Sequence, residues 1–406
     1  MQAEVARRAV VRDLQKTYRL DVAVLLFAHA ELRAVSDPVL PDSLPTTKQP
    51  ELRAELEAAL REGVRRVAAV PPDPPGAGVR EIERHRGGVT LQAFGLDAEH
   101  QPGAAVQRLP VAQLERVLKR YAERKPEGKR EAALVLVWRA LTRYSYLGLR
   151  SNDSAAVPPE IYARFREFDA VEGFASLFNS TLPRYHGMFP DLEADFGCVG
   201  NFFALPPREA PALLLCNPPY ANFLLNAFAN KCLQLLEGGR TTILCVLPAF
   251  ETSDREALNA GGGCAAQYPV DFATDVDTSL LKRSRFNRHC GLYCKESFRF
   301  VDPMRDEQAA LTSVMLIVLS SLSRMYPTVA TILDAFPQRT IPCSDGPRAV
   351  ALYTDITVKT GQAGQAGGRP GRASRGAAAP ANNWAGGWAV AAAAAGLTAV
   401  LAAALN

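Results

Sequence analysis

The hydrophobic pattern divides the chain into an amino-terminal part with helical spacing and a central part with short apolar runs. In the first part, apolar residues recur every three or four positions, as they do in amphipathic helices. Four segments show this spacing: 3–32, 51–67, 110–123 and 130–149. A Pro/Gly-rich connection at residues 71–78 interrupts it. We therefore expect residues 1–150 to form a helical domain.

The central part combines short apolar runs with one longer amphipathic segment. Residues 212–216 are apolar, residues 222–236 carry apolar side chains at helical spacing, and residues 242–247 are apolar again. A strand, a helix and a second strand in this order predict a βαβ unit with parallel strands. We therefore expect an α/β domain over residues 151–358, with ligands bound at the carboxyl ends of its strands.

The first of these strands is followed by the tetrapeptide Asn217, Pro218, Pro219 and Tyr220. An exocyclic amine on an aromatic base is a poor nucleophile, because its lone pair is delocalised into the ring. A site that accepts both N–H hydrogens aims this lone pair at an electrophilic methyl group. The Asn217 side-chain carbonyl and the Pro218 backbone carbonyl are the candidate acceptors, and the prolines hold the backbone in place.

Tyr220 adds a flat face on which a base can stack, a contact worth roughly 1–3 kcal/mol. The tetrapeptide therefore predicts methyl transfer to a planar amine, with all four of its residues in the catalytic site. The competing interpretation is a simple turn, because Asn and Pro are strong turn formers. A strand before the tetrapeptide and a helix after it favour the catalytic interpretation.

Two upstream segments are candidates for binding the methyl donor, S-adenosylmethionine. Residues 169–176 are typical of a short strand that ends in small and polar residues. Residues 195–202 contain two closely spaced glycines, which allow a ligand to approach the backbone. The predicted cofactor-binding residues are Phe174, Ala175, Ser176, Asn179, Phe196, Gly197, Gly200 and Asn217.

Several short strings together resemble the cap-specific adenosine N6-methyltransferases of the phosphorylated-CTD-interacting-factor type. They are FASLFN at 174–179, FPD at 189–191, FGCVG at 196–200, NPPY at 217–220 and SRFNRH at 284–289. An upstream helix with Trp138, Arg139, Arg143, Tyr144 and Leu147 resembles that family too. The resemblance covers residues 130–320.

This resemblance implies methyl transfer to N6 of a 2'-O-methyladenosine next to the 7-methylguanosine cap of mRNA, with S-adenosyl-L-methionine as cofactor. It implies a Rossmann-like class I methyltransferase domain packed against the amino-terminal helical domain, whose helices help to form the cap-binding surface. It also implies capped mRNA as partner and a nuclear location.

The segment 282–289 places four fixed positive charges and one aromatic ring within eight residues. This composition suits phosphates and a stacked base, although a solvated charged loop has the same composition. With the resemblance, Arg285, Arg288 and His289 become predicted substrate-binding residues. Phe250 is a fourth, because it stands where the family typically has a tryptophan.

The chain departs from the family pattern at a few positions. Leu177 replaces a usual proline, and the three tryptophans, Trp138, Trp384 and Trp388, do not form the amino-terminal WW domain of the animal members. This argues against binding to the tail of RNA polymerase II. Two alternatives stay open: methyl transfer to adenine in DNA or to a protein glutamine amide, and a non-catalytic cap-binding scaffold.

Charge and cysteine content add little to this interpretation. The net charge of the 406 residues is +4, so local patches must account for nucleic-acid binding. The basic run at 119–130 is interpreted as a helix surface and linker, or as a weak nuclear-import signal. The eight cysteines are scattered, which predicts reduced core residues in an intracellular protein. His289, Cys290 and Cys294 lack a second ligand pair, so no metal site is predicted.

The carboxyl-terminal part is expected to lack a core. Residues 359–385 are rich in Gly, Ala and Arg and are interpreted as a flexible linker. Residues 386–406 form an alanine-rich hydrophobic tail, whose uncharged run meets the length criterion for a membrane span. Since alanine contributes little to insertion, the alternatives are a membrane anchor and a loosely helical tail. Residues 1–16 lack the apolar core of a secretory signal.

Overall fold

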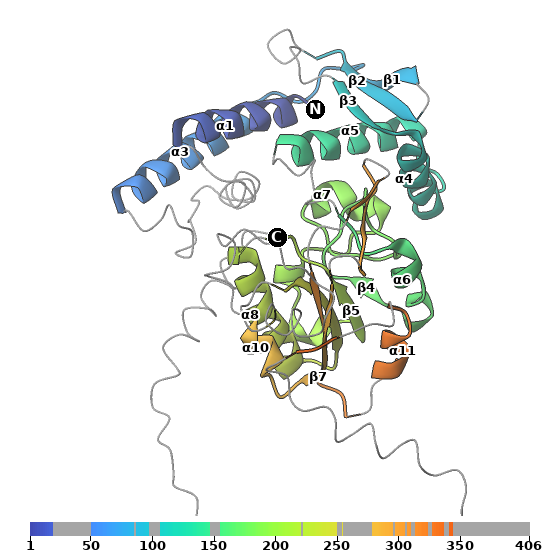
Figure 1. The fold of residues 1–406 in the computed structure, drawn as a ribbon. Coiled ribbons are helices and arrows are strands. Elements are labelled where there is room, and N and C mark those ends of the chain that lie inside the picture. Colours follow the sequence, from blue (N-terminus) through green and yellow to red (C-terminus); the bar gives the residue numbers. More distant parts are fainter. Residues whose placement is uncertain are drawn as a thin grey trace, which may run out of the picture.

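The computed structural model describes residues 1–18, 50–84, 87–96, 106–146, 155–220, 222–249, 254, 278–294, 297–304, 307–309, 313–323, 327–336 and 341–343. Within these ranges the protein is a mixed α/β structure with two main sheets. Figure 1 shows a three-stranded sheet with its helices at one end of the molecule and a six-stranded sheet at the other.

The amino-terminal end contains the predicted helices. They are α1 (Gln2–Tyr18), α3 (Pro50–Ala68), α4 (Val111–Arg124) and α5 (Arg130–Tyr146). The extension of the first helix to residue 32 lies outside the described residues. Helix α1 packs on α3 and α5, and α5 also packs against the small sheet (Figure 1).

The prediction of an entirely helical amino-terminal domain was wrong for residues 78–110. These form the antiparallel strands β1 (Gly78–Arg84), β2 (Gly88–Phe94) and β3 (Val106–Pro110). Val89, Leu91 and Ala93 alternate with more polar residues and are buried on one face of β2. This is the two-residue period of a half-buried strand, but β3 is short and four of the seven residues of β1 are charged, which weakened the signal.

The six-stranded sheet has the order β11-β7-β10-β6-β5-β4. Its strands are β4 (Val171–Glu172), β5 (Leu213–Cys216), β6 (Thr242–Pro248), β7 (Asn287–Tyr293), β10 (Val314–Ser320) and β11 (Ile341–Pro342). Strands β4, β5 and β6 are parallel, whereas β10 is antiparallel to both β6 and β7. Strand β7 therefore runs in the same direction as β4, β5 and β6.

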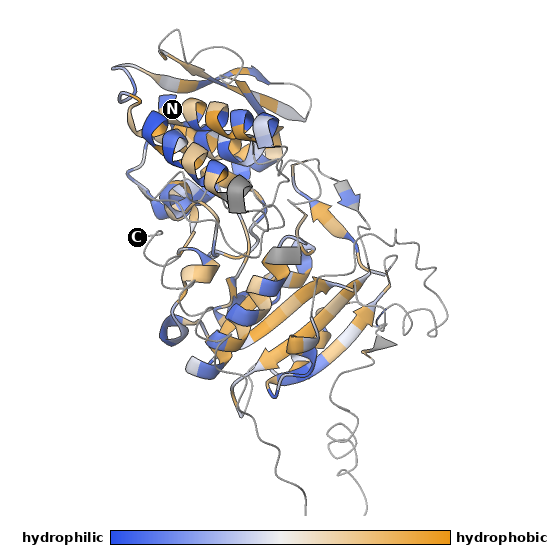
Figure 2. Ribbon diagram, turned by 90° about the vertical axis from the view of Figure 1, so that its left-hand side faces the viewer, coloured by the Kyte–Doolittle hydropathy of each residue, from blue (hydrophilic) through white to orange (hydrophobic). Residues whose placement is uncertain are grey.

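The predicted βαβ unit is confirmed. Helix α8 (Asn222–Gly238) connects β5 to β6, and these two strands are buried along their whole length because helices cover both faces of the sheet. Leu214, Cys216 and Ile243 pack with α8 on one face. Leu213 and Leu215 pack on the other face with residues of α6 (Pro159–Ala163) and α11 (Val329–Leu333). Figure 2 shows the strands as mostly hydrophobic.

The remaining described elements are short. Helix α7 (Pro190–Glu193) lies against α5, α10 (Ser279–Lys282) precedes β7, and β8 (Phe300–Asp302) pairs with β9 (Glu307–Ala309). Two single parallel bridges extend the large sheet beyond β4. Glu172 pairs with Tyr185, and Tyr185 pairs with Cys198. The backbone segments that contain Glu172, Tyr185 and Cys198 therefore run side by side.

The amino-terminal core continues into the segments that follow β4. Leu177, Phe178, Phe189 and Phe196 belong to the same hydrophobic cluster as Trp138 of α5. The helices of residues 1–150 and the loops of residues 177–198 thus share one core.

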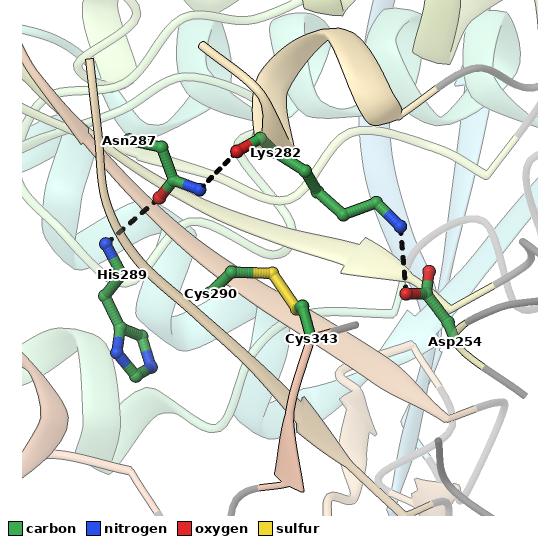
Figure 3. The surroundings of a disulfide bond; sticks show 6 residues. All are labelled: Asp254, Lys282, Asn287, His289, Cys290 and Cys343. Atoms are coloured by element: carbon green, nitrogen blue, oxygen red, sulfur yellow. Dashed lines mark hydrogen bonds and ion pairs between the residues drawn. A yellow bond between two sulfur atoms is a disulfide. The ribbon is translucent and has the colours of Figure 1, made fainter. Parts of the chain in front are cut away.

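The prediction that all cysteines are reduced was wrong for Cys290 and Cys343, which form a disulfide (Figure 3). The register of β7 and β11 places them opposite one another, with Cα atoms 5.6 Å apart. Cys294 is also disulfide-bonded. Cys198, Cys216, Cys232 and Cys245 are buried thiols outside any disulfide, as predicted for core residues.

The carboxyl-terminal linker and tail, with the predicted membrane-contacting run, lie outside the described residues. Among the helices of the described ranges, none has the length and apolar character needed to cross a membrane.

Candidate functional site

The tetrapeptide lies at the carboxyl end of β5, directly beside the loop that leaves β4. The Gly173 N–H donates to the carbonyl of Leu215 at 2.8 Å. A Cβ atom on Gly173 would lie 2.4 Å from the sulfur of Cys216, so only glycine permits this approach. The two strand ends are therefore held together next to Asn217.

The Asn217 side chain is held at both of its polar atoms. Its Nδ2 donates to the backbone carbonyl of Ala155 at 3.1 Å, and its Oδ1 accepts from the Tyr220 hydroxyl at 3.2 Å. An amide oxygen has two lone pairs, so Oδ1 retains capacity for a second donor. Asn217 and Tyr220 are three positions apart in the sequence, and the turn through Pro218 and Pro219 brings their side chains into contact.

Tyr220 is half-buried, with its ring at the junction of two core clusters. The edge-to-face contact with Phe300 has a centroid distance of 6.1 Å and an interplanar angle of 82°. The hydrogen bond to Asn217 and the contact with Phe300 together restrict the orientation of the ring. These contacts thus give the tetrapeptide a defined conformation.

Phe174, the first predicted cofactor-binding residue, belongs to an aromatic cluster at the same edge of the sheet. Its ring centroid lies 4.6 Å from that of Phe202, 5.7 Å from that of Phe203 and 5.5 Å from that of Phe228. Phe174 is only half-buried, whereas Phe202 and Phe228 are buried. The cluster therefore presents part of one ring beside the loop that begins at Gly173.

Ser176 and Asn179 shape this loop by bonding to one another. The Asn179 Oδ1 accepts from the Ser176 N–H at 2.6 Å and from the Ser176 hydroxyl at 3.1 Å. The Ala175 N–H donates to the carbonyl of His186 at 3.0 Å, which joins the loop to the next parallel segment. Ser176 and Asn179 thus determine the loop conformation.

Of the two predicted glycines, only Gly200 borders open space. It has φ +133°, and a Cβ built there would have no atom within 4 Å. By contrast, a Cβ on Gly197 would lie 2.3 Å from the carbonyl oxygen of Pro183 and 3.1 Å from the Arg124 guanidinium. The Phe196 ring packs on Tyr121 of α4 at 5.5 Å. Phe196 and Gly197 therefore face the amino-terminal helices.

Three buried ionisable residues near this edge were not among the site residues predicted from the sequence. Burial raises the pKa of Glu172 and of Glu193 to about 7, and burial lowers the pKa of His186 to about 4. Glu193 accepts from the Tyr144 hydroxyl at 2.6 Å and from the Leu177 N–H at 3.0 Å. The available signal was Glu172 itself, a charged residue at the end of an apolar strand.

The predicted substrate-binding residues Arg285, Arg288 and His289 lie at the other end of the sheet. They surround the start of β7, whose first residue, Asn287, pairs with Leu319 of β10. That end of β10 adjoins the start of β6, whereas Asn217 follows the end of β5. Phe250 lies outside the described residues.

The side chains of Arg285 and Arg288 are exposed to solvent. The Arg285 guanidinium lies 4.8 Å from the centroid of its neighbour Phe286, and Arg288 donates to the Leu322 carbonyl at 3.4 Å. His289 is half-buried, and burial lowers its pKa. Lys282 is fully buried, and its Nζ lies 2.9 Å from Oδ1 of the buried Asp254, with which it forms an ion pair (Figure 3). Lys282 is thus committed to an internal ion pair.

No group of three or more potential metal ligands occurs among the described residues. Cys290, one of the residues considered for a metal, is in the disulfide with Cys343.

One protein-family model matches the chain over residues 113–261, and its description is "Phosphorylated CTD interacting factor 1 WW domain". The chain is similar to that family over those residues. The match covers less than half of the chain, and it contains the tetrapeptide but not the basic segment at 284–289. No curated protein matches the chain.

The description names a WW domain, a module that we expected the chain to lack. In the structure the matched range includes α4, α5 and strands β4, β5 and β6, which pair in parallel. It contains one tryptophan, Trp138, which is buried in α5.

Proposed function

We propose that the chain is an S-adenosylmethionine-dependent RNA methyltransferase, which modifies N6 of the (2'-O-methyl)adenosine next to the 7-methylguanosine cap of mRNA. The observation that carries this proposal is the placement of Asn217 and Tyr220 at the carboxyl end of a buried parallel strand, beside the Gly173 loop. Sheets of this kind bind their ligands at that edge.

The strand arrangement supports a Rossmann-like class I methyltransferase fold as part of the proposal. With the two bridged segments included, the order is Cys198, Tyr185, β4, β5, β6, β10, β7, followed by the short edge strand β11. Apart from β10 and β11, all of these run in one direction. A single reversed strand between the last two parallel strands is compatible with the class I sheet.

The residues at this edge fit S-adenosylmethionine, which supplies an electrophilic methyl group when bound. Gly200 offers backbone next to open space, Phe174 offers part of an aromatic face, and Ala175 follows Phe174 in the loop that is bonded to His186. Phe196 and Gly197 are not included in the proposed cofactor site, because they pack against α4.

The proposed work of the protein is orientation of the amine. The Asn217 Oδ1 and the Pro218 carbonyl accept the two N–H hydrogens, and Tyr220 stacks on the base. Because Asn217 is already held through Ala155 and Tyr220, little side-chain entropy is lost when the substrate binds. The nitrogen loses its proton to solvent after transfer, so no general base is required.

The decisive experiment uses the purified full chain, labelled S-adenosylmethionine and two short RNAs. Both RNAs begin with 2'-O-methyladenosine, and only one carries the cap. Label at adenine N6 of the capped RNA alone supports the cap-specific function. Label on both RNAs indicates a general adenine methyltransferase. The absence of label on both, with calorimetry showing no cofactor binding, would overturn the proposal and leave the scaffold alternative.

The proposed partner is capped mRNA, with a nuclear location as part of the proposal. The family description adds a phosphorylated CTD as a candidate partner. Binding of the chain to matched phosphorylated and unphosphorylated CTD peptides tests this second partner separately from catalysis.

A further inference from the structure

Helix α4 carries three arginines at four-residue intervals: Arg116, Arg120 and Arg124. Residues separated by four positions lie on the same face of a helix, so the three guanidinium groups form one stripe. The opposite side of α4 is apolar, with Leu114, Val117, Leu118 and Tyr121 buried in the amino-terminal core. The helix is thus anchored in one part of the protein and presents its arginines to another.

The arginine stripe lies against residues 177–183, which continue from the Gly173 loop. Arg116 donates to the carbonyls of Ser180 at 2.8 Å, Leu177 at 3.0 Å and Phe178 at 2.7 Å. Arg120 donates to the Ser180 carbonyl at 3.2 Å and also to the Ser180 hydroxyl. The carbonyls of the loop are therefore bound by charged donors, which make stronger hydrogen bonds than neutral ones.

Arg124 completes the stripe at the end of the loop. It donates to the Pro183 carbonyl at 2.6 Å, in the space left by the missing side chain of Gly197. A methyl group at Gly197 would lie 3.1 Å from the Arg124 guanidinium. The absence of a side chain at Gly197 therefore leaves room for the Arg124 guanidinium.

Two buried carboxyl groups hold the N–H side of the same loop. Glu172 accepts from the N–H groups of Thr181, at 2.6 Å, and Leu182, whereas Glu193 accepts from Leu177. The loop is therefore held from both sides: its carbonyls by α4, and its N–H groups by Glu172 of β4 and Glu193 of α7.

Arg116 and Arg120 have no ion pair with an acidic side chain within the described ranges. Burial and the positive charge of Arg120 lower the pKa of Arg116 to about 10, while the Glu172 carboxylate acts in the opposite direction. A desolvated guanidinium is costly unless its donors are used, and here they are used on main-chain carbonyls and on the side chains of Gln113 and Ser180.

We propose that Arg116 and Arg120 are positioning residues, which hold residues 177–182 so that the preceding loop at 173–176 keeps the shape that binds the cofactor. This inference rests on the proposed function for the identity of the ligand. It also means that the amino-terminal helices support cofactor binding directly through α4.

The test compares Arg116→Gln and Arg116→Lys with Lys119→Gln in the full chain. Lys119 lies on the same helix, and its side chain is 79% exposed, so it is a matched control. The readouts are the dissociation constant for S-adenosylmethionine by calorimetry, the KM for capped RNA, and the melting temperature.

We expect Arg116→Gln to weaken cofactor binding at least tenfold with less than a twofold change in the KM for RNA. Arg116→Lys should recover only part of the affinity, because an ammonium group cannot reach three carbonyls as the guanidinium fork does. Lys119→Gln should match the wild type. A folded Arg116→Gln protein with wild-type cofactor affinity would overturn the proposal, as would an equal rise in both constants.

Hydrogen exchange separates failure of this inference from failure of the proposed function. If the wild type binds no cofactor, the proposed function fails, but amide exchange at Leu177, Thr181 and Leu182 still reports on the loop. Arg116→Gln should accelerate exchange at these amides at least tenfold. Unchanged exchange at these amides would refute the proposal that Arg116 holds residues 177–182. If Arg116→Gln does not fold, Arg120→Lys is measured in the same way with the same two criteria.

Discussion

The two ends of the six-stranded sheet differ in what they bring together. At the carboxyl end of β5, Asn217 contacts Ala155 and Tyr220 and lies beside the Gly173 loop, so distant segments converge there. At the start of β7, the contacts of Arg285 and Arg288 within the described ranges are with a neighbouring ring and one carbonyl. Distant segments also meet near the start of β7, but there they form an internal ion pair, Lys282 with Asp254, and a disulfide, Cys290 with Cys343. At the carboxyl end of β5, by contrast, the Asn217 Oδ1 retains capacity for a second donor.

The same contrast appears in the ionisable groups. The carboxyl end is surrounded by buried groups with displaced pKa values, such as Glu172 and His186. At the other end burial also lowers the pKa of His289, but Arg285 and Arg288 are exposed. Displaced pKa values are frequent in functional sites, whereas exposed cations are weakly coupled through solvent. The comparison therefore predicts that substitutions at the two ends have very different effects on activity.

The largest expected effect is that of Asn217→Ala. Removal of one aimed acceptor should lower kcat for methyl transfer about 10²- to 10³-fold, while the fold and cofactor binding remain. The measurement is methyl transfer to capped RNA, with circular dichroism and cofactor calorimetry as controls. Wild-type turnover of this variant would show that the carboxyl end is not the site of chemistry.

The disulfide beside the start of β7 should affect stability and not catalysis. Cys343→Ser removes a crosslink that spans 53 residues of sequence, which should cost about 2–4 kcal/mol in the free energy of unfolding. Denaturant unfolding with and without a reducing agent checks this. The wild type should lose stability on reduction and the variant should lose less. Equal losses in both proteins would contradict the expected contribution of this crosslink.

Glu193→Gln should change the pH dependence of stability. Burial raises the pKa of Glu193 from 4.5 to about 7, so its protonation stabilises the native state fully below 4.5, and this contribution is lost as the pH rises to 7. At about 1.4 kcal/mol for each pKa unit, the wild type should lose up to roughly 3 kcal/mol relative to the variant. Urea unfolding at pH 5, 6, 7 and 8 measures the difference, and parallel curves would refute it.

Tyr220→Phe should have a smaller effect than Asn217→Ala at the same end. It removes the hydroxyl that donates to Asn217 but keeps the ring for stacking. Loss of one such hydrogen bond costs about 0.5–1.5 kcal/mol, so kcat should fall about two- to tenfold. Tyr220→Ala is the matched comparison, which also removes the stacking face. Equal rates for the two variants would show that the ring does not contact the base.

The smallest effect is expected from the double variant Arg285→Ala with Arg288→Ala. Because both residues lie away from Asn217 and are exposed, kcat should stay at the wild-type value and the KM for capped RNA should change less than about threefold. Steady-state kinetics at two salt concentrations tests this. A large loss of kcat would mean that the basic segment acts at the carboxyl end of β5, and it would contradict the functional difference between the two ends of the sheet.

Much of the central domain could be predicted from the sequence because its signals are local. The apolar runs at β5 and β6, the helical spacing of α8 and the tetrapeptide between them predicted the βαβ unit. The small sheet was missed because its short, charged strands β1 and β3 alternate only weakly. Of the predicted cofactor-binding residues, Phe174, Ala175 and Gly200 lie at the expected edge of the sheet, whereas Phe196 and Gly197 face α4; their binding of a cofactor stays a prediction.

The sequence by itself determined the amino-terminal helices, the βαβ unit and the position of Asn217 after a buried strand, since these depend on residues close to one another in the chain. Only the tertiary structure decided which strand ends share an edge. The insertion of antiparallel β10 between β6 and β7 places the start of β7, with Arg285 and Arg288, opposite the tetrapeptide. The opposition of Cys290 and Cys343, and the contact of Arg116 with the 177–182 loop, were decided in the same way. Such pairings depend on strand order and register, which arise from packing across the whole domain and leave no local mark in the sequence.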